Sequence, residues 1–187
     1  MRYLLITAIL AMTALFSANS PAQESVSDTC APAEIESLQA VQFPEEMRDA
    51  NRKYRNTQLF GYNASEFKTA VTVYIYDKEP VRDLRQEFLG SGSEVVRTHA
   101  GTESAMRGPA KFTVAGKSRD GWLELFLWSE GETDFASFLW IGELSGKYIK
   151  IRTTYIRPEQ DDQTGSAMRY AVTAMRSVAS HVCEPKS

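Results

Sequence analysis

Alternating hydrophobic and polar residues identify the strands of this chain most clearly. Within residues 67–76, Val71, Val73 and Ile75 alternate with threonine and tyrosine, a period of two that predicts a half-buried strand. Four further strands are predicted at 111–115, 122–128, 135–142 and 147–157. Polar turns that contain glycine separate these four, and strands joined by such short turns must be antiparallel. With a short strand at 59–63, we expect one antiparallel sheet of about six strands.

Helical spacing predicts two helices that pack on this sheet. After Pro80, which suits the first turn of a helix, apolar residues recur up to Phe88, and the glycines of 90–92 predict its end. From Ala167 to Val182, small apolar residues keep to one side, which predicts a C-terminal helix with a narrow contact face. The predicted fold class is therefore α+β, an antiparallel sheet with helices packed on it.

The N-terminal part of the chain has weaker patterns. Residues 34–39 could form one or two helical turns before Pro44. Residues 45–57 are densely charged and have few apolar positions, which favours an exposed edge or a mobile loop.

All three tryptophans lie within the predicted strands. Both sides of 122–128 and 135–141 are apolar, so we expect both faces of the sheet to be covered, by helices or by a partner subunit. The tryptophans then belong mainly to the core. The alternative is a binding surface of aromatic and basic residues in the last strands, whose members are Trp140, Tyr148, Lys150, Arg152 and Tyr155.

Residues 1–22 have the parts of a secretory signal peptide: a positive residue, an apolar run, and small residues before an expected cleavage after Ala22. The apolar run is shorter than the roughly 20 residues that span a bilayer, so we expect no stable membrane anchor after processing. Residues 23–187 would then form a single exported domain, periplasmic or secreted. The formal net charge is −3 and no long basic run occurs, which argues against a nucleic-acid-binding surface.

The two cysteines, Cys30 and Cys183, are predicted to form one disulfide bond in an oxidising compartment. Such a bond would join the N-terminal segment to the end of the C-terminal helix. A redox site is the alternative, but the chain lacks the C-x-x-C spacing that lowers the pKa of a thiol.

The sequence contains no coherent set of catalytic residues or metal ligands. The two histidines, His99 and His181, lie in no recognisable triad setting, and phosphate-binding loops and dinucleotide motifs are absent. We therefore expect a non-enzyme without catalytic residues, metal or cofactor. The alternative is a hydrolase or transferase that uses carboxylates such as Asp77, Glu124 or Glu143 as acid and base.

The order of elements resembles that of a known family. A hairpin, the strand VTVYIYD, a helix, a four-strand meander ending in KIRTTY and a C-terminal helix resemble the α/β/α sandwich of the PsbP/Mog1-like proteins. The resemblance covers most of residues 23–187. Proteins of that fold mostly act as accessory or interaction modules, so the resemblance implies a binding role rather than a catalytic one.

These observations predict a periplasmic or secreted, non-catalytic domain that binds a protein partner or a small ligand. Besides the carboxylate-based enzyme, the alternative is a structural subunit that forms homo-oligomers through its sheet.

Overall fold

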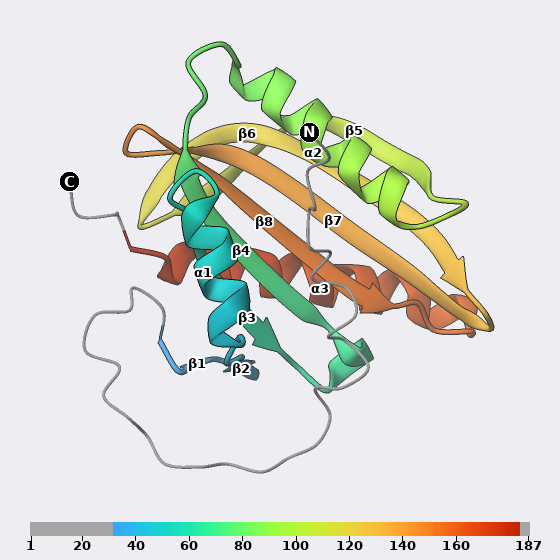
Figure 1. Cartoon of the computed structure of the whole chain (residues 1–187). Coiled ribbons are helices and arrows are strands. Elements are labelled where there is room, and N and C mark those ends of the chain that lie inside the picture. Colours follow the sequence, from blue (N-terminus) through green and yellow to red (C-terminus); the bar gives the residue numbers. More distant parts are fainter. Residues whose placement is uncertain (1–31, 184–187) are drawn as a thin grey trace.

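A computed structural model describes residues 32–183 of the chain (Figure 1). Within that range, eight strands form one antiparallel sheet in the order β1-β2-β3-β4-β8-β7-β6-β5. The strands are β1 (Glu34–Ile35), β2 (Leu38–Ala40), β3 (Gln58–Asn63), β4 (Ala70–Asp77), β5 (Glu103–Val114), β6 (Lys117–Glu130), β7 (Thr133–Leu144) and β8 (Lys147–Ile156). The helices are α1 (Glu45–Lys53), the 3-10 turn η1 (Glu66–Lys68), α2 (Leu84–Thr98) and α3 (Asp161–His181).

The helices cover both faces of the sheet, which confirms the predicted α+β class. Figure 1 shows α1 and α2 on one face and α3 behind the sheet on the other. In the meander, β6 and β7 are longer at both ends than predicted and β5 begins eight residues earlier, whereas β8 matches its prediction to within one residue. Strand β4 pairs with β8 in the middle of the sheet. The chain reaches that arrangement by crossing from β4 through α2 to the far edge at β5.

Two predictions for the N-terminal part are wrong. Residues 34–40 form the β1–β2 hairpin instead of a helical turn, and Glu36 occupies its turn with a positive φ of 54°. Ile35 and Leu38, three residues apart, still bury their side chains, because paired residues flanking a two-residue turn lie on the same face. Residues 45–53 form α1 without burying any residue. Its acidic first turn and basic last turn suit the helix dipole, a signal that does not depend on an apolar face.

Helix α2 also differs from its prediction. It begins after Asp83, whose side chain accepts from the backbone N–H of Gln86 in a capping box, whereas Val81 lies outside the helix and is exposed. It then continues through Gly90 and Gly92 to Thr98. The cap outweighs the first-turn preference of proline, and packing against the sheet offsets the cost of the two glycines.

The opposite face holds the larger core. Helix α3 contacts the sheet through small residues, as its narrow apolar face predicts, and these buried residues include Ala167, Ala171, Ala174 and Val178. Trp140 is fully buried on this side, and its ring lies so close to Gly121 and Gly142 that a Cβ at either position would overlap it. Its indole N–H donates to the Ala110 carbonyl at 3.2 Å. Trp140 is therefore a core residue.

Residues 1–22 and Cys30 lie outside the described part of the chain, so the signal peptide, its cleavage after Ala22 and the disulfide stay predictions. Among the described helices, none is long and apolar enough to cross a bilayer.

Gly92 permits a close approach between α2 and the sheet, and its replacement by alanine tests how tightly the two pack. A Cβ at Gly92 would lie 2.9 Å from Oε2 of Glu124, whereas at Gly90 the nearest atom is Nη1 of Arg82 at 3.6 Å. Replacement of either glycine by alanine gains about 1 kcal/mol of helix propensity. We expect Gly90→Ala to raise the free energy of unfolding, and Gly92→Ala to be less stable than Gly90→Ala by at least about 1 kcal/mol, because Glu124 is buried. Urea denaturation measures both values, and equal stabilisation would contradict this account.

The surroundings of Cys183 bear on the predicted disulfide bond. The Tyr62 hydroxyl donates to the Pro32 carbonyl at 3.1 Å, and burial together with the nearby Cys183 raises the pKa of Tyr62 to about 12. Tyr62 is thus close to Cys183 and also to Pro32, which follows Cys30 by two residues in the sequence. A bond closing so long a loop should contribute on the order of 4 kcal/mol. We expect thiol labelling of the denatured, unreduced protein to find no reactive thiol; two labelled thiols would refute the bond.

Candidate functional site

A strip of polar side chains lies on the α1/α2 face of the two central strands. Alternate residues of β4 and β8 point to this face, and the strand register places Thr72 beside Arg152 and Tyr74 beside Lys150. We call these four residues the basic strip. They are partly exposed, whereas the intervening residues of both strands are buried on the α3 side. The strip therefore follows from the same alternation that builds the core.

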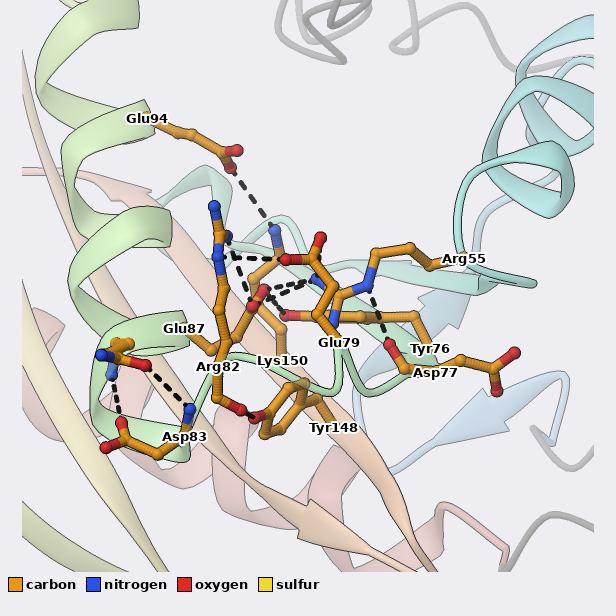
Figure 2. Close-up of polar contacts among 11 residues, drawn as sticks. Arg55, Tyr76, Asp77, Glu79, Arg82, Asp83, Glu87, Glu94, Tyr148 and Lys150 are labelled. Carbon is orange, nitrogen blue, oxygen red and sulfur yellow. Dashed lines mark hydrogen bonds and ion pairs between the residues drawn. The ribbon is translucent and has the colours of Figure 1, made fainter.

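Lys150 has one weak ionic partner among the described residues. Its Nζ lies 3.8 Å from a carboxylate oxygen of Glu94 on α2, and Figure 2 shows this pair above the sheet. The amine also lies 4.7 Å from the ring centroid of Tyr74, a cation–π distance. Burial lowers the pKa of Lys150, while Glu94 opposes that change. Only 21% of the Lys150 side chain is exposed, so the charge is poorly hydrated and only loosely neutralised.

Arg152 is held in position by neutral groups. Its Nε donates to Oγ of Ser137 at 2.9 Å, and its Nη2 lies 3.4 Å from Nε2 of His99. The guanidinium carbon lies 5.8 Å from the ring of Trp128. Within the described part of the chain, no carboxylate oxygen lies within 4.0 Å of a guanidinium nitrogen of Arg152, the distance that defines an ion pair. Burial lowers the pKa of this guanidinium, which is the expected cost of a cation that lacks a counter-charge.

His99 fixes the orientation of this arginine. Its ring is buried and stacks on Trp128 with centroids 4.2 Å apart. Nδ1 lies 2.7 Å from Oε1 of Glu130, which also accepts from the Trp128 indole N–H. Arginine can only donate, so Nε2 of His99 must accept from Arg152 and Nδ1 must carry the proton. Burial lowers the pKa of His99, which favours this neutral form.

A buried carboxylate closes one end of the strip. Glu87 of α2 accepts from Nη1 of Arg55 at 3.0 and 3.1 Å and from the hydroxyl of Tyr76 at 3.0 Å (Figure 2). Arg82 lies 3.6 Å away on the outer side. Burial, followed by the charge of Glu87, raises the pKa of Tyr76 well above its usual value. We call Arg55, Tyr76 and Glu87 the Glu87 clamp, because they tie the segment after α1 to the start of α2.

The five residues predicted as a binding surface do not share one face. Tyr148, Lys150 and Arg152 lie on the α1/α2 face, where the Tyr148 hydroxyl donates to the Arg82 carbonyl at 2.7 Å. Trp140 and Tyr155 are buried in the core on the α3 side. The structure thus brings together the two basic residues and separates them from the tryptophan.

Sequence reasoning missed the residues that surround the two cations. Glu94 lies on α2, His99 directly follows that helix and Glu130 ends β6, so all three are far along the chain from Lys150 and Arg152. A signal for Glu94 existed in the i, i+7 spacing from Glu87 on α2. This spacing was not used, because the glycines of 90–92 were expected to end the helix before Glu94.

The carboxylates considered for catalysis are dispersed. Glu124 is buried beneath α2 and accepts from Arg107 and Ser104, both at 2.6 Å. Asp77 and Glu143 lie near one end of the sheet but on opposite faces, where they pair with Lys147 and Lys78, respectively. Over residues 32–183, no group of three or more histidine, cysteine or acidic residues is placed to hold a metal ion.

A separate hollow of about 420 Å³ lies where η1 meets the ends of β7 and β8. Its lining includes Phe67, Glu132, Asp134 and Arg157. None of the five predicted surface residues lines it.

Comparison with known proteins supports the fold. No protein-family description and no curated protein sequence matches the chain. The structure is similar to that of the Ran-binding protein Mog1p of Saccharomyces cerevisiae, with 9% identity, 78% of this chain and 93% of that chain covered, and a TM-score of 0.43. It is also similar to a mutant of Mog1, with 9% identity, 66% and 77% covered, and a TM-score of 0.42. The predicted resemblance is confirmed to this extent: the fold is Mog1-like.

The predicted periplasmic or secreted location is corrected by the same comparison. The neighbours are Mog1 proteins, one of them described as Ran-binding, and this points away from a periplasmic or secreted location.

The lowered pKa of His99 predicts a pH-dependent stability. Between the ordinary value of 6.5 and the lower pKa of the folded protein, the unfolded chain binds more protons than the folded one. The free energy of unfolding should therefore fall as the pH falls through this window, by about 1.4 kcal/mol for each unit by which the pKa is lowered. Urea denaturation at a series of pH values, in the wild type and in His99→Gln, measures the effect.

The difference between the two proteins isolates His99 from the carboxylates that titrate at lower pH. We expect a smaller loss of stability on acidification in His99→Gln. His181→Gln is the matched control, because His181 is exposed, and it should follow the wild type. Parallel curves for wild type and His99→Gln would show that this histidine has no such role.

Proposed function

We propose that this protein is a non-catalytic domain that binds a protein partner through the basic strip and the exposed end of α2 beside it. The observation that carries the proposal is Arg152, a partly buried cation that neutral groups orient and that no described carboxylate neutralises. Desolvating a charge without a counter-charge costs free energy, and a binding partner that supplies an anion recovers it.

The position of the strip favours a partner with an extended surface. The sheet is covered by α3 on one face and by α1 and α2 on the other. On the α1/α2 face, the basic strip is the part of the central strands that stays partly exposed. The hollow of about 420 Å³ lies elsewhere, at the junction of η1 with β7 and β8. A protein segment laid between α1 and α2 therefore suits the strip better than an enclosed small ligand does.

The proposal does not depend on the structural neighbours. Mog1p is described as a Ran-binding protein, and a likeness at 9% identity and a TM-score of 0.43 concerns the fold alone. The two cations Arg152 and Lys150 are the features of this chain that favour binding.

Site-specific photo-crosslinking in the native cell tests the proposal. Thr98 is exposed, lies one helical turn beyond Glu94 and so borders the strip. A photo-reactive residue at Thr98 should give one dominant protein adduct that mass spectrometry can identify. In the background of Arg152→Gln the yield should fall roughly tenfold, because a charged hydrogen bond is lost.

The matched control is the same photo-reactive residue at Thr173, which is exposed on α3 at the opposite face. It should not give this adduct. An equal yield from Thr98 and Thr173, or a yield that Arg152→Gln leaves unchanged, would reject partner binding at the strip.

A further inference from the structure

We infer that the partner places an acidic segment in extended conformation along the basic strip, with carboxylates at alternate positions meeting Lys150 and Arg152. This inference rests on the proposed function and adds the chemical class of the bound segment. It follows from the spacing of the two cations, from the donors that Arg152 leaves available, and from the weak internal pair of Lys150.

The spacing of the cations matches that of an extended chain. Lys150 and Arg152 are two residues apart on β8 and point to the same face. Two residues of a strand span about 6.8 Å, and alternate side chains of any extended segment repeat at the same distance. Carboxylates at positions i and i+2 of such a segment can therefore meet both cations at once. A single small anion fits less well than such a segment, because it cannot contact two cations about 6.8 Å apart equally closely.

Arg152 is pre-organised to receive a carboxylate. One of its five N–H groups donates to Ser137, and one nitrogen faces His99, which leaves other donors of the planar guanidinium for a ligand. Ser137 and His99 fix the side chain before binding, so less conformational entropy is lost when the anion arrives. Neutral His99 orients the cation without supplying a competing negative charge.

Glu94 is an internal substitute for one carboxylate of the partner. It approaches Lys150 only to 3.8 Å and its side chain is 36% exposed, so the pair is weak and open to exchange. An incoming carboxylate at Lys150 must displace Glu94 or bind beside it against like-charge repulsion. Removal of the Glu94 charge should therefore strengthen binding, the opposite of what a residue that contacts the partner favourably would do.

A defined peptide tests this chemistry without knowledge of the natural partner. A capped, fluorescently labelled hexaglutamate is titrated with the full chain at low ionic strength, where screening is least, and anisotropy gives the Kd. We expect Arg152→Gln to weaken binding roughly tenfold and Glu94→Gln to strengthen it about threefold. Arg152→Lys, which keeps the charge but loses the planar fork, should fall between Arg152→Gln and the wild type.

Three controls separate this inference from general electrostatics. Arg169→Gln removes an exposed cation on α3 and should leave the Kd unchanged. A labelled hexaglutamine should bind at least tenfold more weakly than hexaglutamate. Inorganic phosphate at the same charge concentration as unlabelled hexaglutamate should displace the labelled peptide less effectively. Thermal melting of each variant confirms that the chain remains folded.

The results distinguish the inference from the function on which it rests. Weaker binding by Glu94→Gln, equal binding of hexaglutamine, or equal competition by phosphate would overturn the acidic-segment inference. If Thr98 still captures a partner in an Arg152-dependent way, the proposed function survives and the strip recognises a different chemistry. If the peptide binds as expected while crosslinking at Thr98 fails, the chemistry of the strip is supported and partner binding at this place is not.

Discussion

The contact between Arg55 and the buried carboxylate of Glu87 is the interaction on which the α1/α2 face of this protein depends. Glu87 is 5% exposed and is compensated by Arg55 and by the hydroxyl of Tyr76. Loss of one partner from a buried ion pair generally costs about 3–5 kcal/mol, because the remaining charge stays desolvated. The pair joins the segment after α1 to the first turn of α2 across β4. It therefore links the two helices that flank the basic strip.

The contact between α2 and the sheet combines an apolar cluster, which includes Phe88 and Val95, with several buried polar groups. Glu124, Ser137 and His99 are all buried there, each with hydrogen-bond partners. Gly92 lets α2 approach Glu124 closely, and His99 at the end of the helix orients Arg152. A buried polar group constrains its neighbours more than an apolar one does, because it must keep its partners. The two cations of the strip are consequently held at fixed positions on β8.

Much of the fold was predictable from residue patterns alone. The alternation in β4 and the glycine turns of the meander predicted the central sheet, and the small residues of α3 predicted its close packing. Hydrophobic periodicity missed the hairpin at Ile35 and Leu38 and also α1, because the hairpin depends on tertiary contacts and the signal for α1 lies in its terminal charges. The length of α2 was underestimated because packing on the sheet overrides the low helix propensity of glycine.

The sequence by itself determined which face of β8 carries Lys150 and Arg152, because a strand presents alternate residues to opposite sides. It also placed the tryptophans in strands that are covered on both faces. Only the tertiary structure decided that Trp140 and Tyr155 lie on the opposite face from these cations, and that Glu94 and His99 lie beside them. The partners of a charged group come from distant segments, so no local pattern reports them. The charge balance of the site is for that reason a property of the fold.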